Sequence, residues 1–215
     1  MRTRPQEGFT LVELLVVLLL VGIVGGYVTT SIVRGLQVSR EVSVRATALH
    51  DIERSLQVVA RELRVADPIY LADDGEHAST IGAEVVRNRT VQVHTFYIEP
   101  EIEDGPLLLF QEITEYDLDE VAGGDPLKAT PVTLPRRRLI TDVDNGIDAV
   151  FTYHRADGSE IDCEADGLSG TACVSALGRA NQIGIRLVRN VTGQEPIRAE
   201  TRVNVRNTRY GRVLS

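Results

Sequence analysis

Three groups of residues in this 215-residue chain have types and spacings that could support chemistry. Glu13 is a lone carboxylate in an apolar run, Cys163 and Cys173 stand ten positions apart, and three aspartates lie in DVDNGID, residues 142–148. The chain has neither an HExxH motif, nor a local Ser-His-Asp signature, nor a Gly-rich phosphate loop. We therefore expect a protein that is not an enzyme and uses no cofactor, with its four histidines on strands or at the surface.

The aspartates Asp142, Asp144 and Asp148 are spaced as at the start of an EF-hand calcium loop. The glutamate that would complete such a loop is missing, because position 153 is tyrosine. An Asn-Gly turn that leads into a strand explains the same residues. The three are a weak calcium candidate, and we expect no other metal site.

The two cysteines enclose the spacer EADGLSGTA, which is loop-like in composition. A disulfide between Cys163 and Cys173 would contribute about 2–3 kcal/mol outside the cytosol. CxxC spacing is absent and only His154 lies nearby, so zinc is not expected. Two unpaired thiols remain the alternative.

The apolar run around Glu13 is long enough to cross a membrane. Residues 9–28 contain a single charge and would form a helix of about 30 Å. Arg2 and Arg4 precede this run, so the positive-inside rule keeps the N-terminus cytoplasmic and puts the rest across the membrane. A charged acid at mid-membrane costs about 2.5–3.5 kcal/mol, and less near the end of the helix, where Glu13 lies.

The stretch GFTLVELLVVLLLVGIV resembles the class III signal of type IV pilins and of the pseudopilins of type II secretion. The resemblance implies that a prepilin peptidase removes leader residues 1–8 by cutting between Gly8 and Phe9. It also implies a methylated Phe9 amine and makes Glu13 the assembly glutamate. In a low-dielectric filament core, the amine of one subunit would pair with the Glu13 of a neighbour and set the axial register. A plain signal anchor with a stray acid is the alternative reading.

The resemblance also implies partners and a location. The partners are the prepilin peptidase, other major and minor pilins or pseudopilins, and an inner-membrane assembly platform. The chain would span the inner membrane once before it is assembled into a pilus or pseudopilus. A membrane-anchored extracytoplasmic enzyme or sensor with a β-rich domain is the alternative function.

A second helical segment follows the membrane span. Apolar residues at 42, 49, 52, 56, 59, 63 and 66 form one stripe, which indicates an amphipathic stalk over residues 29–67. Pro68 ends the pattern, so residues 9–66 are predicted as one helix of about 85 Å. The stripe should lie on a sheet, although a helical partner or coiled coil would bury it equally well.

From residue 68 to residue 215 the sequence predicts a globular β-rich domain. Five segments alternate with period two: 89–99, 106–116, 146–155, 181–190 and 196–207. Turn signals such as Asp-Gly and Asn-Gly separate them. We expect an α+β, pilin-like fold, in which an antiparallel sheet has one polar face and one face covered by the stalk helix.

Weaker similarities concern the subclass. SLQVVARELRVADP, GIDAVFTYHRADGS, IGIRLVRN and the C-terminal VRN are similar to PilW-class minor pilins and J-type minor pseudopilins. This similarity implies a minor subunit in a tip or initiation complex. It does not choose among pilus, secretion and competence systems.

Charge is segregated along the chain, whose net charge is −8. Residues 90–127 contain ten acids and no lysine or arginine, whereas residues 176–215 contain eight arginines and two acids. The net charge argues against a whole-molecule grip on nucleic acid. Opposite patches suit head-to-tail neighbours in a filament. Contact of the arginine-rich strand with DNA, and plain solvation of both faces, remain open.

Overall fold

The chain divides into two compact units, Met1–Ala46 and Thr47–Ser215. The computed structural model describes residues 10–67, 69–71, 79–87, 90–100, 102, 105–117, 130–146, 148–163, 165–168 and 170–205. The predicted cleavage residues Gly8 and Phe9 lie outside these ranges.

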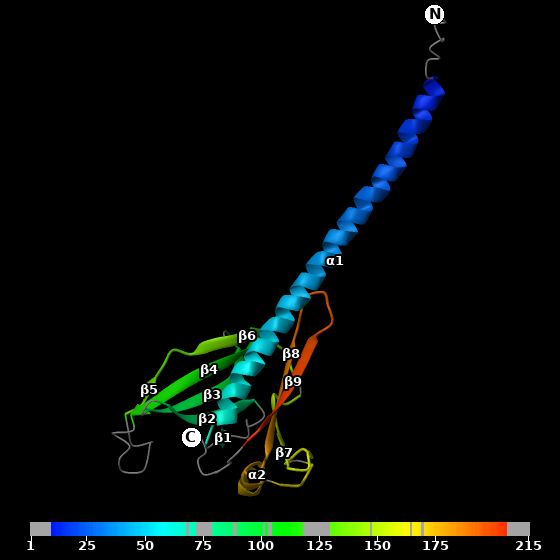
Figure 1. Ribbon diagram of the computed structural model, residues 1–215. Helices are drawn as coiled ribbons and strands as arrows, with labels where there is room; N and C mark the ends of the chain where they lie inside the picture. The colour runs from blue at the N-terminus through cyan, green and yellow to red at the C-terminus, as the bar shows by residue number, and fades with distance from the viewer. Residues whose placement is uncertain are drawn as a thin grey trace, which may run out of the picture. The chain divides into compact units, whose positions relative to one another are not determined.

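Helix α1 runs from Leu11 to Val65, close to the single helix predicted over residues 9–66 (Figure 1). Its first part belongs to the N-terminal unit and its last part to the globular unit. Directly after the helix, the Asp67 N–H donates a 2.9 Å hydrogen bond to the Glu84 carbonyl. This bond ties the end of the helix to the sheet.

The last part of α1 buries one face within the globular unit, as the apolar stripe predicts. Ile52, Val59 and Leu63 are fully buried in the main core. The prediction was wrong for Leu49, whose side chain is 40% exposed within the globular unit. The buried face begins at Ala48, so helical periodicity alone does not show where the covering sheet ends.

The described residues form one antiparallel sheet of nine strands, which confirms the predicted α+β class. The sheet order is β1-β2-β3-β4-β6-β8-β7, with β5 paired to β4 and β9 paired to β8. The strands are β1 (Ile69–Leu71), β2 (Thr80–Arg87), β3 (Thr90–Pro100), β4 (Leu107–Asp117), β5 (Val132–Thr133), β6 (Arg137–Val143), β7 (Phe151–His154), β8 (Gln182–Arg189) and β9 (Ile197–Asn204).

Four of the five predicted strands match β3, β4, β8 and β9 closely. The fifth, predicted over residues 146–155, is only the four-residue β7. Strands β1, β2, β5 and β6 were not predicted. In β9 the predicted alternation is confirmed, since Ile197 and Val203 are buried while Arg198 and Arg202 are exposed.

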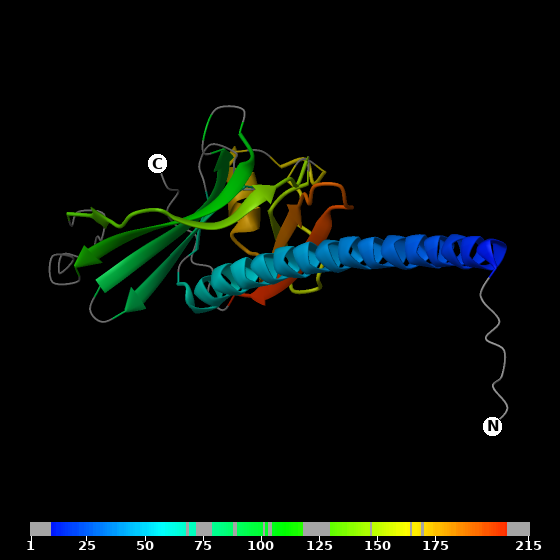
Figure 2. The same ribbon diagram turned by 90° about the horizontal axis from the view of Figure 1, so that it is seen from above.

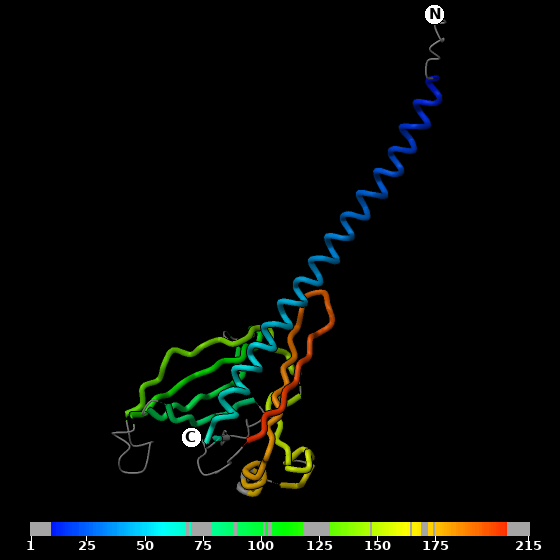
Figure 3. The backbone as a smooth tube through the Cα atoms, in the orientation of Figure 1, coloured from blue at the N-terminus to red at the C-terminus, as the bar shows by residue number. Residues whose placement is uncertain are grey.

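The sheet has a seam, because β6 and β7 both pair with β8. Figures 2 and 3 show β8 in orange beside its other neighbour, β9, in red. Strand β6 meets β8 at a single residue pair, Val143 and Arg189. Beside this pair, the Asn145 side chain accepts a hydrogen bond from the Val188 N–H (2.9 Å) and donates one to the Arg186 carbonyl (2.8 Å). One side-chain amide therefore substitutes for a peptide group in the ladder.

A short helix, α2 (Gly170–Leu177), begins in the spacer that sequence composition assigned to a loop. The structure joins Cys163 to Cys173 of α2 by a disulfide, with their Cα atoms 5.4 Å apart. Cys173 and Leu177 are buried in the main core. The disulfide thus ties α2 to the loop that leads into it from β7.

Candidate functional site

The N-terminal turn of α1 positions Glu13. Thr10 caps the helix, because its Oγ1 accepts a hydrogen bond of 3.3 Å from the Glu13 N–H, and its carbonyl accepts one of 3.2 Å from the Leu14 N–H. Thr10 and Glu13 have the T-x-x-E spacing of a capping box. The sequence analysis assigned Glu13 a role in docking and did not predict this helix cap. The T-x-x-E pattern of residues 10–13 would have indicated it.

Glu13 lies among apolar side chains that are exposed within the N-terminal unit. Every large apolar residue from Leu11 to Val28 is at least 47% exposed. An 18-residue stretch of α1 has none of its surface buried, and the helix is long and apolar enough to cross a membrane. Such a surface needs lipid or other helices around it. A carboxylate there is also placed favourably toward the positive end of the helix dipole.

Polar groups deeper in this segment are satisfied within the helix. The Thr29 and Thr30 hydroxyls donate to the carbonyls of Gly25 and Gly26, each at 2.9 Å. Added Cβ atoms at Gly25 and Gly26 would meet nothing within 4 Å. The surface around these glycines is therefore open to a lipid chain or to another helix, and it has no unpaired hydroxyl donor at these two threonines.

The aspartates of the calcium candidate bind protein groups. Asp144 accepts hydrogen bonds from the Gly146 N–H (3.2 Å) and from the Asn190 side chain (2.6 Å). Asp148 faces Arg186 at 3.9 Å, and Asp142 accepts a hydrogen bond from the neighbouring Thr141 hydroxyl. Among the described residues, no group of three or more His, Cys, Asp or Glu side chains could hold a metal ion.

The histidines show no catalytic arrangement in the described ranges. His94 on β3 is buried with its Nδ1 2.9 Å from the Gln111 amide nitrogen, and burial lowers its pKa. His154 on β7 is buried with its Nε2 3.0 Å from the Thr152 hydroxyl. Within that part of the chain the Nδ1 of His154 has no partner, so no carboxylate orients the ring as in a triad. His50 is exposed on α1.

The C-terminal arginines are partly neutralised within the globular unit. Glu200 pairs with both Arg186 and Arg202, at 3.4 and 3.5 Å. Arg189 pairs with Asp51 of α1 at 2.9 Å. The predicted basic patch on β9 is therefore weaker than the residue count suggests, and Arg206 lies outside the described residues.

A family model described as the prokaryotic N-terminal methylation motif matches residues 3–29, which include the capped turn and the apolar segment. The chain is type IV pilin-like. The motif indicates a pilin or pseudopilin that a prepilin peptidase processes and that assembles with other pilins. A membrane-anchored pilin fits both the motif and the apolar helix. No curated protein and no solved structure matches the chain.

Proposed function

We propose that this pilin-like protein is a minor type IV pilin or pseudopilin that enters the tip or initiation complex of a filament. The observation that carries the proposal is the position of Glu13, a carboxylate in the first turn of an exposed apolar helix within the methylation motif. The similarity of SLQVVARELRVADP and GIDAVFTYHRADGS to minor subunits supports the minor class.

Cleavage between Gly8 and Phe9 would create an amine four residues before Glu13 in the sequence. In the filament, that amine pairs with the Glu13 carboxylate of a neighbouring subunit. The pairing neutralises a charge that costs free energy in an apolar core, and it fixes the axial register of the two helices. In the lipid-embedded subunit, Glu13 is tolerated because it lies near the helix end.

The parts of the chain then have separate tasks. Residues 1–8 form the leader, 9–28 span the inner membrane, 29–67 form the stalk, and 68–215 form the globular domain. The membrane span is released into the filament during assembly, and the globular domain lies outside the cytoplasm. An oxidising compartment there is consistent with the disulfide of Cys163 and Cys173.

The test replaces Glu13 by glutamine in the full-length protein in its source cells, with Glu53→Gln as the matched control on the same helix. Mass spectrometry of the membrane fraction should show a mature, methylated Phe9 in wild type and in both variants. Incorporation into sheared filaments should fall at least tenfold for E13Q and stay normal for E53Q. A wild-type chain that keeps its leader, or an E13Q chain that assembles normally, refutes the proposal. An intact leader would favour a signal-anchored enzyme or sensor.

A further inference from the structure

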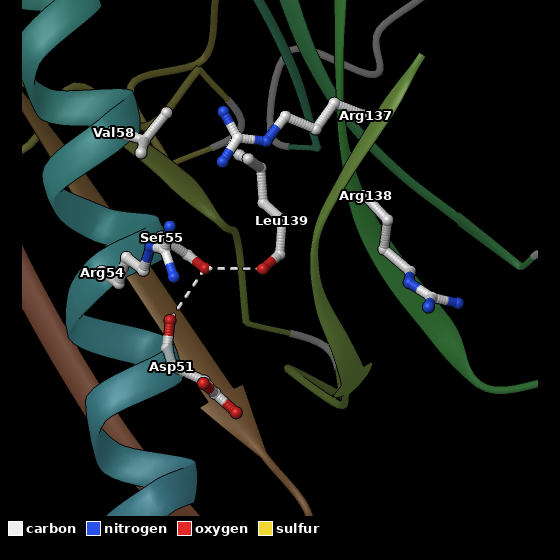
Figure 4. Close-up of a pocket in the computed structure, with 7 residues that line it drawn as sticks. All are labelled: Asp51, Arg54, Ser55, Val58, Arg137, Arg138 and Leu139. Atoms are coloured by element: carbon white, nitrogen blue, oxygen red, sulfur yellow. Dashed lines mark hydrogen bonds between the residues drawn. The ribbon is translucent and has the colours of Figure 1, made fainter. Parts of the chain in front are cut away.

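Polar contacts join α1 to the sheet at two levels within the globular unit. At the first level, Arg189 of β8 pairs with Asp51 at 2.9 Å, and the Ser55 hydroxyl lies 3.0 Å from the Leu139 carbonyl of β6. Figure 4 shows the contact of Ser55 at the cleft between α1 and β6. Neither contact contains a histidine. The second level lies about two helical turns further along α1, at Glu62, and includes a buried histidine of the sheet.

The second level is a buried polar cluster between the last turns of α1 and the sheet. Its members are Glu62 of α1, His94 of β3 and Gln111 of β4, all of them buried. His94 and Phe96 are two residues apart on β3, and Gln111 pairs with Phe96, so these three side chains lie on one face of the sheet. Phe96 belongs to the main core together with Leu63 of α1. The face that carries His94 is therefore the one that α1 covers.

The cluster accommodates His94 as the neutral imidazole. The side-chain amide nitrogen of Gln111 lies 2.9 Å from Nδ1 of His94, so the amide donates and Nδ1 accepts. The ring proton is then on Nε2, which is buried and has no hydrogen-bond partner in the part of the chain that the structure describes. A second proton, on Nδ1, would place two donors against each other. The hydrogen bonding of the cluster thus opposes the imidazolium form.

The charges around His94 do not compensate an imidazolium either. Four charged groups act on the ring: Glu62 and Arg61 of α1, Arg87 at the end of β2, and Glu115 of β4. Glu62 already accepts hydrogen bonds from both arginines, and Glu115 accepts one of 2.6 Å from a neighbouring side-chain amide. Two acids and two bases cancel, so a proton on the ring adds an unneutralised charge to a buried cluster. Burial accordingly lowers the pKa of His94.

The end of α1 is the part of this junction with the fewest backbone contacts. Strand β3 is paired to β2 on one side and to β4 on the other along most of its length. Past Ser55, one backbone hydrogen bond joins the described residues of the helix end to the sheet, from the Asp67 N–H to the Glu84 carbonyl. A charge at His94 therefore reaches water at the lowest cost when the helix end moves and β3 stays in place.

We propose that protonation of His94 releases the last turns of α1, after Ser55, from the sheet, so that water solvates the imidazolium. The contacts of Asp51 and Ser55 stay closed, because they hold the helix to β8 and β6 on the other side of the release point. The junction is thus closed near neutral pH and opens in acid. This device does not depend on the proposed function, although a globular unit outside the cytoplasm would expose it to the acidity of the medium.

Linkage gives the size of the effect. In the released state the ring is exposed, and its pKa is about 6.5, whereas in the closed state it is lower. Between these two values each opening takes up one proton. The equilibrium constant for opening should therefore rise about tenfold for each pH unit below about 6.5, and it should be independent of pH above that value.

The experiment is amide hydrogen exchange of the full-length protein in mild detergent micelles, followed by NMR from about pH 8 to about pH 5. After correction for the intrinsic pH dependence of exchange, the amides of residues 62–65 should lose protection about tenfold per pH unit below about 6.5. Low concentrations of urea should change their exchange little, since the opening is local. The amides of β8 should be better protected and should depend on urea as global unfolding does.

Matched variants assign the effect to one ring. H94Q should remove the pH dependence of residues 62–65. H154Q alters another buried histidine, on β7, and should leave it unchanged. H50Q, which alters an exposed histidine of α1, serves as the control if H154Q does not fold. If H94Q does not fold, NMR titration of the wild-type ring provides the reading, because the steep region must end at the pKa measured for His94.

Four results would overturn the inference. Protection of residues 62–65 that does not fall below about pH 6.5 excludes the release. A slope that H94Q retains assigns the proton to another group, such as Glu62. A urea dependence equal to that of β8 shows that the whole unit unfolds and that no local release occurs. A His94 ring that titrates at or above about 6.5 shows that the closed cluster does not oppose its charge.

Discussion

Glu62 of α1 is a carboxylate almost completely buried between the helix and the sheet, with its side chain 1% exposed. Its Oε1 accepts hydrogen bonds from Arg61, at 3.1 Å from Nε and 2.9 Å from Nη2. Its Oε2 accepts one of 2.6 Å from Arg87 Nη2 at the end of β2. Replacing Arg87 by methionine keeps much of the aliphatic packing but leaves one buried oxygen without its partner.

The size of the effect follows from these contacts. Removing one partner of a buried ion pair costs about 3–5 kcal/mol, because the remaining charge is stranded away from water. Arg87 is 43% exposed and Arg61 stays bound to the other oxygen, so R87M should cost less, about 2–3 kcal/mol. Adding Glu62→Gln removes the stranded charge. The double variant should therefore recover at least half of the loss, which a double-mutant cycle measures as coupling.

The assay is urea unfolding of the full-length protein in mild detergent micelles, followed by the circular dichroism of the sheet. Arg198→Met, an exposed arginine on β9, is the matched control and should change stability by less than about 0.5 kcal/mol. Two results would refute the reasoning: an R87M chain within about 0.5 kcal/mol of wild type, or a double variant no more stable than R87M alone.

Three further predictions concern the globular unit. Replacing Cys163 and Cys173 by serine should cost about 2–3 kcal/mol in urea unfolding, and a reductant should then have no further effect. Gly184→Ala should lower the free energy of unfolding by about 1–3 kcal/mol, because the added Cβ would clash with Thr152 Oγ1. Adding Thr152→Ala removes that oxygen and should restore part of the lost stability. Burial lowers the pKa of His94 in the folded chain, so its contribution to stability is complete above the unfolded value of about 6.5 and is lost as the pH falls through the folded pKa. H94Q should flatten this part of the stability–pH profile, and an unchanged slope would exclude the buried imidazole as its cause.

Local pattern was sufficient for the long helix and for the strands with strict alternation, such as β9. Local sequence pattern did not predict the elements that depend on strand pairing, on small residues or on the disulfide. Strand β6 has few apolar residues, shifts register against β4, and contains Asp142 at a φ of 59°, so its sequence does not alternate. Strand β2 includes Gly82 and Ala83, which weaken its strand signal. Helix α2 consists largely of small residues, whose composition is typical of a loop. The disulfide at Cys173, which fixes the helix in place, is not evident from that composition.

The candidate sites also differ in whether local sequence is enough to find them. Glu13 was identified from sequence because its charge conflicts with its apolar surroundings over a few residues. The burial of Glu62 depends on which strands lie beside α1. That depends on sheet order and register, and neither can be read from the spacing of residues along one segment.

The side-chain amide of Asn145, which joins β6 to β8 at the seam, is also a chemically labile group. Asn145 precedes Gly146, and Asn-Gly is the dipeptide that loses side-chain ammonia most readily, through a cyclic imide formed by the following backbone nitrogen. In the folded chain the Asn145 amide is held on both sides by β8, while the Gly146 N–H is bonded to Asp144 at 3.2 Å. The native fold thus suppresses deamidation. If the unfolded chain deamidates and then refolds, the new carboxylate at position 145 faces the Arg186 carbonyl. Deamidation at this position would replace the hydrogen bond to the Arg186 carbonyl by a repulsion between two oxygens and so weaken the junction of β6 with β8.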